Sequence, residues 1–304
     1  MPVTGQSGLA DGVREQILLF CVMLATAIGT TGMQSVLPAI GRSLHLPDPV
    51  IAVAFSLSAL LFALAAPAWA KRLGAFGSKR MIQIGNAGFV VSMVVCGLAL
   101  TAGLRGVLAA PIAFGCFVVG RGIYGLFGSA ATPAAQSMVV TITPRKAWTK
   151  ALSVLASAFG LGTILGPALA PFFVFPFAGL AGPAYVFAVL GILMSVVIAT
   201  QLRDVPRSSD AHAVALEEPT IGGEPSDVTA AAAAAPAAGV HVGYTDPRIW
   251  PWILAGLISG HAQAIAGQTL AFLVIDRLAA PPATAQPLIG MILMGGALAA
   301  LLAQ

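Results

Sequence analysis

Long apolar runs separated by short polar loops make up most of this chain. Eight runs approach the roughly 20 residues that a helix needs to cross the hydrocarbon of a bilayer. They lie at residues 17–40, 50–70, 81–102, 107–140, 151–175, 183–202, 249–275 and 285–304. The fourth is too long for one straight span, so we expect either a tilted helix or a cytoplasmic extension over residues 133–140. The pattern predicts an all-α, polytopic membrane protein.

The pattern changes between residues 203 and 248. This stretch is rich in Ala, Pro, Gly and Ser, lacks periodic apolar positions and holds most of the acidic residues. Such a composition is typical of a flexible linker. We therefore predict a six-helix bundle over residues 1–202, a cytoplasmic linker over 203–248, and the start of a second bundle over 249–304. The last run ends at Gln304 without a polar tail, so we expect this second bundle to be incomplete and the chain to be a C-terminally truncated fragment.

Composition supports the lipid bilayer as the main surroundings. Charged residues make up 9% of the 304 residues and hydrophobic residues 58%, whereas a soluble domain carries about 25% charged residues. The first 16 residues are polar and the run that follows is longer than the apolar core of a signal peptide. We therefore interpret this run as the first transmembrane helix and not as a cleaved signal.

Several classes of function lack their sequence signals. No phosphate-binding loop is present, so we expect no ATP-driven step. The basic residues form no stripe with interleaved aromatics, so we expect no nucleic-acid partner. The three cysteines lie inside apolar runs, without the spacing of a metal site. We predict a protein that is not an enzyme and that has no cofactor or metal.

Lysine and arginine are distributed unequally between the two sides of the membrane. If the N-terminus is cytoplasmic, eleven of these residues lie on the cytoplasmic side and three on the other. The three are Arg42, Arg105 and Arg277. Because cytoplasmic loops carry an excess of basic residues, we predict a multi-pass protein of the inner cell membrane with a cytoplasmic N-terminus.

Arg121 lies inside the fourth apolar run. A charge in hydrocarbon costs several kcal/mol, and such residues almost always face a bundle interior or a water-filled cavity. We expect Arg121 to face a polar pathway, although it could instead satisfy helix-end carbonyls. Tyr124 lies three residues later, close to the same helix face, and could line the same cavity.

A stretch after the second run contains Trp69, Gly77 and Lys79, in the context Pro67 to Arg80. These residues match part of the loop signature of the major facilitator superfamily, whose members have two six-helix halves, and the chain resembles that family. The acidic position of the signature falls on Gly74 and the next arginine on Ala75. Those departures put the family's loop charge relay in doubt for this chain.

Three further patterns carry the resemblance. Arg121 and Gly125 resemble the family's R-x-x-x-G signature, in which the arginine is linked to proton transfer. Residues 29–38 run from a glycine to a proline, as in the first helix of drug exporters. Gly162, Gly166 and Pro167 resemble the G-x-x-x-G-P motif of drug/proton antiporters, which separates exporters from importers. The resemblance implies a twelve-helix exporter with protons as coupling ion.

The physics of the last motif stands without the family. Gly162 and Gly166 lie one turn apart and allow a neighbouring backbone to approach closely. Pro167 removes a helix hydrogen bond and favours a bend. These residues could form a pivot on which two halves rock. The alternative is simple packing, because Gly and Pro are frequent in membrane helices.

Polar residues in the other runs are few. Gln34 in the first run could bind substrate or another helix. His261 and Gln268 in the seventh run are seven residues apart and therefore share a face. His261 could titrate near neutral pH, although a lone histidine in a membrane helix is more often a hydrogen-bonded contact between helices.

Carboxylates are almost absent from the predicted spans. Asp276 ends the seventh run beside Arg277, and we expect a local ion pair there. A proton antiporter needs a group that releases its proton when substrate binds. That group would be His261, Asp276 or a residue beyond Gln304.

These patterns predict a secondary active transporter that exports small hydrophobic compounds in exchange for protons by alternating access. We expect Arg121, Tyr124, Gln34, His261 and Gln268 to line the pathway, with a small molecule and protons as ligands. One alternative is a facilitator-type importer or uniporter of a small metabolite or an anion. The other is a degenerate fragment that does not transport.

Overall fold

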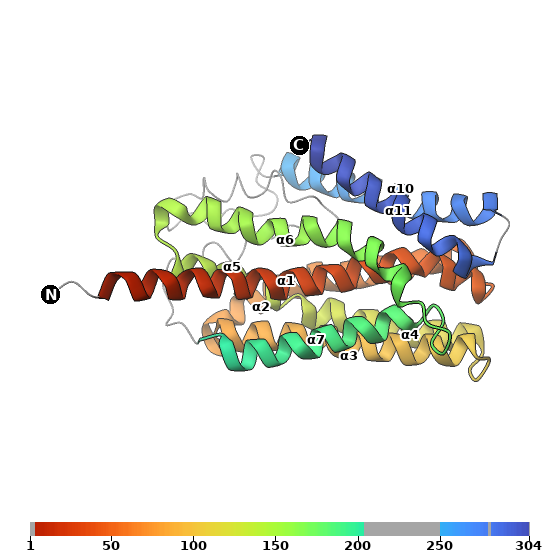
Figure 1. Ribbon diagram of the computed structural model, residues 1–304, viewed down its shortest axis with the longest axis horizontal. Helices are drawn as coiled ribbons and strands as arrows, with labels where there is room; N and C mark the ends of the chain where they lie inside the picture. The colour runs from red at the N-terminus through yellow and green to blue at the C-terminus, as the bar shows by residue number, and fades with distance from the viewer. Residues whose placement is uncertain (1–3, 204–249, 279–280, 304) are drawn as a thin grey trace.

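The computed structural model describes residues 4–203, 250–278 and 281–303 and consists of helices arranged in two groups (Figure 1). The first bundle comprises α1 (Thr4–Ser43), α2 (Asp48–Phe76), α3 (Ser78–Leu104), α4 (Ala110–Ile123), α5 (Ala131–Ile142), α6 (Trp148–Leu169) and α7 (Gly182–Gln201). The second group comprises α10 (Trp250–Leu278) and α11 (Pro282–Ala303). No strand occurs among these residues, so the all-α prediction is confirmed. The predicted linker falls almost wholly outside the described residues.

Seven helical segments are long and apolar enough to cross a membrane within the described part of the chain. They match seven of the eight predicted spans. The remaining predicted span forms α10, a helix of 29 residues. Gly77, with φ of 79°, separates α2 from α3 and adopts a backbone conformation that glycine reaches most easily.

The first helix is longer than the apolar run predicts. It begins at Thr4, so Glu15 lies inside α1, where its side chain is buried. The polar segment before the first span is therefore part of the helix and not a separate tail. We use the names Arg14 end and Arg42 end for the two ends of the bundle that α1 connects.

The fourth span is interrupted and not extended. A π-helical turn at Tyr124–Gly128 separates α4 from α5. Residues of α5 such as Ala134 and Met138 are buried and pack with Leu19 of α1 and Met81 of α3. Most side chains of residues 133–140, for which we expected either a tilted helix or a cytoplasmic extension, therefore belong to the packed interior of the bundle.

Two apolar clusters form the interior. The cluster near the Arg14 end contains only first-bundle residues among those described. The cluster near the Arg42 end also contains Ala271 and Ile275 of α10 and Ala285 and Ile289 of α11. The second group therefore packs onto the first bundle at the Arg42 end. In Figure 1 the opposite ends of α10 and α11 rise away from α1.

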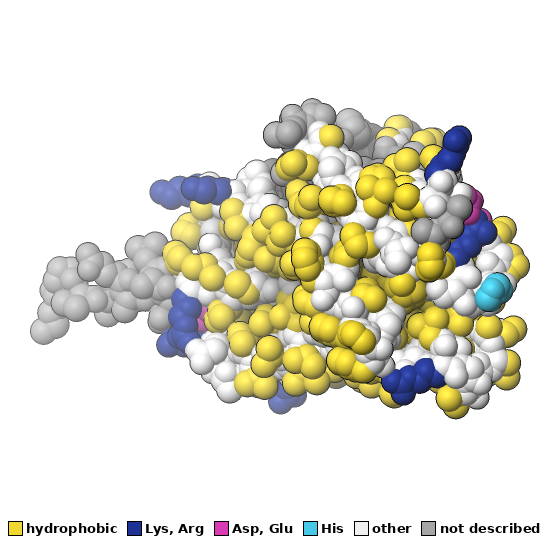
Figure 2. All heavy atoms as spheres, turned by 45° about the vertical axis from the view of Figure 1, so that its right-hand side comes forward, with side chains coloured by type: hydrophobic (Ala, Val, Ile, Leu, Met, Phe, Trp, Pro, Cys, Tyr) yellow, Lys and Arg dark blue, Asp and Glu magenta, His cyan; other side chains and the backbone are white. Residues whose placement is uncertain are grey.

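The outer surface suits lipid. Large apolar side chains such as Leu64, Val119 and Val196 are exposed on the outside of the bundle. Figure 2 shows hydrophobic side chains across the middle of one face, with lysine and arginine lying away from that middle. A soluble protein rarely exposes so large an apolar surface.

Candidate functional site

Arg121 lies in the interior of the first bundle. The helix rise of 1.5 Å per residue places it about 17 Å from the start of α4. Its side chain is only 1% exposed. Its Cζ atom lies 4.6 Å from the centre of the Phe55 ring and 5.1 Å from that of Tyr124. Two aromatic faces therefore contact the cation, and Tyr124 lies beside it.

The glycines that flank Arg121 let α4 approach its neighbours closely. A Cβ atom added to Gly120 would lie 2.9 Å from Sγ of Cys96 in α3. One added to Gly125 would lie 2.5 Å from the carbonyl oxygen of Ser58 in α2. Helices this close leave little space around the guanidinium. The prediction that Arg121 faces an open wet cavity is therefore wrong for this conformation, in which aromatic and helix packing enclose the group.

The enclosed guanidinium is not fully paired. Its Nε and Nη1 atoms are buried and have no hydrogen-bond partner. No carboxylate among the described residues forms an ion pair with it. Buried donors without acceptors are rare in folded proteins and point to a role, a water or an ion at that position. Arg121 thus retains unused capacity to bind an acceptor.

The backbone beside Arg121 is irregular. The π-helical turn at Tyr124–Gly128 begins three residues after it, and such turns occur frequently at functional sites. Ser58 Oγ donates to the Arg121 carbonyl at 2.8 Å. Trp69 Nε1 donates to the Leu126 carbonyl, inside the turn, at 2.7 Å. Side chains of α2 therefore satisfy one carbonyl just before the interruption and one inside it.

The face of α6 that carries the predicted motif packs against α1. A Cβ atom added to Gly166 would lie 2.6 Å from the backbone nitrogen of Gly32. One added to Gly162 would overlap Ala27. Thr31 Oγ1 lies 2.7 Å from the Gly162 carbonyl oxygen and can donate to it. Close backbone approach is thus what these two glycines provide, and the partner is a helix of the same bundle.

Pro167 marks the contact with the second group. A Cβ atom added to Gly290 of α11 would lie 2.5 Å from the Pro167 carbonyl oxygen and 3.0 Å from Cγ of Pro171. The motif on α6 therefore lies between α1 on one side and α11 on the other. This position suits a pivot between the two groups, and the pivot remains a prediction.

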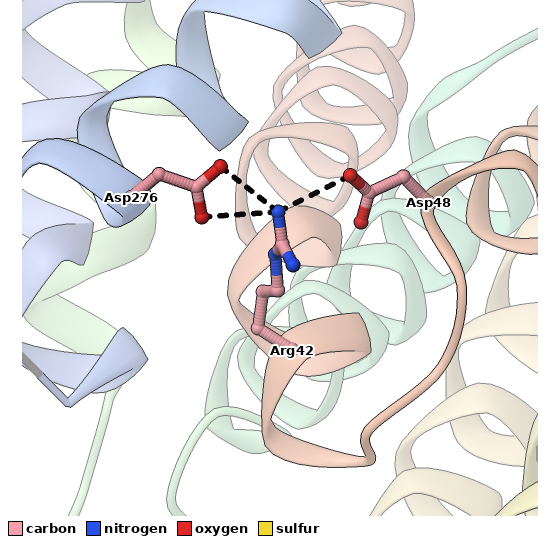
Figure 3. A network of polar contacts seen from close by, with 3 residues as sticks. All are labelled: Arg42, Asp48 and Asp276. Carbon is pink, nitrogen blue, oxygen red and sulfur yellow. Dashed lines mark hydrogen bonds and ion pairs between the residues drawn. The ribbon is translucent and has the colours of Figure 1, made fainter. Parts of the chain in front are cut away.

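A charged network joins the two groups at the Arg42 end (Figure 3). Arg42 Nη2 lies 3.2 Å from Oδ2 of Asp48 and 3.0 Å from Oδ1 of Asp276. The Arg42 guanidinium also lies 5.4 Å from the Phe272 ring centre. The predicted local ion pair between Asp276 and Arg277 is wrong, because the Asp276 carboxylate turns toward Arg42 of the first bundle.

Gln286 is a buried polar residue that sequence reasoning missed. Its side chain is 0% exposed, its Nε2 donates to the Ser35 carbonyl at 3.3 Å, and its Oε1 has no partner. It therefore adds a polar contact between α11 and α1 near the Arg42 end, beside the contact of Arg42 with Asp276 of α10. The available signal was a glutamine at the start of the last apolar run. Because the predicted run begins at residue 285 whereas α11 begins at Pro282, Gln286 looked like a residue at the end of the helix.

The remaining predicted pathway residues are not brought to Arg121. Gln34 is half-buried in α1. Gln268 is half-buried in α10, and its Oε1 is buried without a hydrogen-bond partner. Among the described residues, no hydrogen bond links either glutamine to Arg121. His261 lies in α10, but its side chain falls outside those described.

The loop residues act as local ties. Besides its bond to Leu126, Trp69 stacks with the Arg72 guanidinium at 5.9 Å. Gly77 forms the tight turn between α2 and α3. Lys79 Nζ donates to the Ala199 carbonyl near the end of α7 at 3.1 Å. All three predicted residues therefore hold helices together at the Arg14 end.

Comparison with known proteins identifies the family. The family model for the Major Facilitator Superfamily matches residues 19–304, which include almost every element described above. No curated protein matches the chain closely enough to count as a relative. Since the matched stretch covers both helix groups and most of α1, the chain belongs to the major facilitator superfamily of membrane transporters.

Proposed function

We propose that this chain exports small, largely apolar compounds in exchange for protons, by alternating access between its two helix groups. The observation that carries the proposal is the uneven contact between them. The second group packs into the apolar cluster at the Arg42 end, whereas the cluster near the Arg14 end contains only first-bundle residues among those described. Contact at one end is the arrangement expected of halves that rock around a site near the membrane midplane.

The direction of transport rests on the α6 motif. Gly162 and Gly166 pack α6 against α1, and Pro167 contacts α11. The resemblance to the antiporter motif of drug exporters therefore coincides with a junction of three helices. The positive-inside rule supports a location in the inner cell membrane with the N-terminus on the cytoplasmic side. The Arg42 end then faces away from the cytoplasm.

Proton coupling needs a group that titrates. Of the carboxylates inside described helices, Asp276 lies where the two groups meet, and His261 lies on the same helix. One of these two groups would then release its proton during the cycle. Apolar walls with few polar groups suit hydrophobic substrates.

Inside-out membrane vesicles test the proposal. A pH gradient, acid inside, is followed with a quenched acridine dye while lipophilic dyes and drugs are added one at a time. An antiporter substrate is expected to release protons and restore dye fluorescence in vesicles that contain the chain. Vesicles with the Arg121→Gln variant at equal protein level serve as control. Substrate movement that ignores the pH gradient would contradict proton coupling, and no movement of any compound would contradict transport.

A second candidate function follows from Arg121. Its unpartnered Nε and Nη1 atoms favour a substrate that carries an anionic group, moved by a facilitator-type importer or uniporter. Proteoliposomes with little internal potassium, placed in potassium-rich buffer with valinomycin, develop a positive interior that drives uptake of an anion. Uptake of benzoate that follows the potential and ignores the pH gradient would support this candidate. Uptake that follows only the pH gradient would contradict it.

A further inference from the structure

Three charged side chains at the Arg42 end share one nitrogen atom. Arg42 Nη2 lies 3.2 Å from Oδ2 of Asp48, and 3.0 and 3.1 Å from the two oxygens of Asp276. The two carboxylates approach this nitrogen from opposite sides (Figure 3), so the cation lies between two negative charges. The two N–H groups of Nη2 can serve both carboxylates at once, while Arg42 Nε has no hydrogen-bond partner among the described residues.

The two carboxylates belong to different moving parts. Asp48 opens α2 and lies six residues after Arg42, so this pair stays together whenever the first bundle moves as a unit. Asp276 lies near the end of α10 in the second group. When the two groups separate at this end, Arg42 loses Asp276 and keeps Asp48.

The surroundings indicate that contact between the groups closes this end and that their separation opens it. Ala285 and Ile289 of α11 are buried against the first bundle just below the network, together with Gln286. The charged groups themselves are partly exposed, with side chains 33% exposed for Arg42, 40% for Asp48 and 56% for Asp276. The partly exposed charged residues therefore lie at the edge of the buried, mostly apolar contact between the two helix groups.

We propose that Arg42, Asp48 and Asp276 form an adjustable latch, in which Asp276 closes the Arg42 end and Asp48 weakens that closure. This inference rests on the proposed alternating access. Closure brings Asp276 toward Arg42, which is favourable, and toward Asp48, which is unfavourable. The attraction of Asp276 to Arg42 minus its repulsion from Asp48 determines how stable the closed end is. An intermediate stability allows the end to open during each transport cycle.

The signs of the expected effects follow directly. Asp276→Asn removes both terms and weakens closure. Arg42→Gln removes the attraction and leaves the repulsion, so it weakens closure further. Asp48→Asn removes only the repulsion and strengthens closure. The two aspartates contact the same nitrogen, yet their removal shifts the latch in opposite directions.

Cysteine labelling measures the latch without a substrate. The native cysteines are replaced (Cys21→Ser, Cys96→Ala and Cys116→Ser), and Ala285→Cys is introduced as a reporter that is 0% exposed when the end is shut. A membrane-impermeant maleimide is added to right-side-out and to inside-out vesicles. Because exposure requires opening, the labelling rate reports the open fraction. Val107→Cys, 75% exposed in the loop after α3, serves as the control for reagent access.

Partly exposed ion pairs contribute about 0.2–1 kcal/mol, and 1.4 kcal/mol corresponds to a tenfold change. We therefore expect labelling of Ala285→Cys to rise about two- to fivefold with Asp276→Asn and further with Arg42→Gln. It should fall about twofold with Asp48→Asn. Adding Asp276→Asn to Arg42→Gln should lower the rate again, because the remaining repulsion disappears. Labelling at Val107→Cys should stay constant.

The outcomes separate the latch from the proposed function. Equal effects of the two aspartate variants, or no change in any variant, would overturn the latch even in vesicles that transport. The predicted order of labelling rates in vesicles that transport nothing would support the latch and contradict the proposed function. If Ala285→Cys fails to fold, Ser35→Cys on α1 is a near-isosteric reporter, 2% exposed at the same contact.

Discussion

Two arginines of this chain show what a guanidinium can do in a membrane protein. Arg121 is 1% exposed, lies between two aromatic rings and has two nitrogens without hydrogen-bond partners. Arg42 is half-buried at the rim, contacts two carboxylates and joins two helix groups. The first has no counterion among the described residues, and the second is shared between two carboxylates across the contact of the two groups.

The two arginines differ in whether their contacts lie within one helix group or are divided between the two groups. The surroundings of Arg121 belong wholly to the first bundle among the described contacts, since Phe55 and Tyr124 lie on α2 and directly after α4. Rocking of the second group therefore leaves them in place. The partners of Arg42 are divided between the groups, so its environment changes whenever the groups move. We expect substitutions at Arg121 to affect transport strongly and substitutions at Arg42 to shift a conformational balance.

Replacing Arg121 by methionine gives the largest expected effect. An unpaired charge in hydrocarbon costs about 2.5–3.5 kcal/mol on insertion scales, while each ring contact returns about 0.5–2 kcal/mol. Methionine has similar length and no charge, so the unfolding temperature in detergent should stay the same or rise. Transport in vesicles should fall at least about tenfold, since a binding group is lost.

The matched control for this prediction is Arg105→Met. Arg105 lies outside the helices and donates to the Phe177 carbonyl at 2.6 Å. This variant removes an equal charge at an aqueous boundary and should leave transport unchanged. Retained transport together with a lower unfolding temperature in Arg121→Met would assign Arg121 to structure alone.

Lysine substitutions sharpen the comparison. Arg121→Lys replaces a planar group that stacks on Phe55 and Tyr124 with a compact ammonium that loses its proton more readily when buried. We expect transport to fall about tenfold. Arg42→Lys keeps a charge beside two partly exposed carboxylates, so labelling of the Ala285→Cys reporter should change less than about twofold. Equal tolerance at both positions would contradict the distinction drawn here.

The helical fold and the close packing at the α6 glycines could be predicted from the sequence because both depend on local patterns. The length of an apolar run indicates whether a helix can cross the bilayer. The spacing of Gly162 and Gly166 indicates a helix face of small residues. Sequence reasoning also placed Tyr124 beside Arg121, since residues three apart share a helix side. It did not predict the enclosure of Arg121, which depends on how Phe55 of a different helix packs against it.

The contacts between groups could not be predicted for the same reason. Asp276 and Arg277 are neighbours in sequence, which favours a local pair on any one-dimensional argument. The helix geometry instead carries the Asp276 carboxylate to Arg42, 234 positions away in the chain. Likewise, the tilted helix or cytoplasmic extension was inferred from the length of the fourth apolar run alone. The structure instead interrupts this run with a π-helical turn at Tyr124–Gly128.

A smaller effect is expected at Ser58. Its hydroxyl donates to the Arg121 carbonyl at 2.8 Å, beside the interrupted part of the fourth span. Interhelical hydrogen bonds in membranes contribute about 0.6 kcal/mol on average. Ser58→Ala should therefore lower the unfolding temperature slightly and reduce transport less than Arg121→Met.

Ser157→Ala is the control for this prediction. Ser157 donates within its own helix to the Val154 carbonyl at 2.7 Å, on an exposed face. Both variants lose one hydroxyl, but only Ser58 connects two helices beside Arg121. Identical transport in the two variants would show that the bond has no influence on the arginine.

Salt should give the smallest effect and distinguishes the two arginines without any mutation. The Debye length falls from about 10 Å at 0.1 M salt to about 3 Å at 1 M, so attraction within the partly exposed Arg42 network weakens while the enclosed Arg121 is screened little. Labelling of Ala285→Cys in right-side-out vesicles should therefore rise, by less than about threefold for pairs of this kind. The same increase in salt should leave the Arg42→Gln, Asp276→Asn double variant unchanged, because neither opposite charges nor the aspartate repulsion remain there. The ratio of transport rates between wild type and Arg121→Met should also stay constant. If salt altered that ratio instead, Arg121 would be reached by mobile ions, and the distinction between the two arginines would no longer hold.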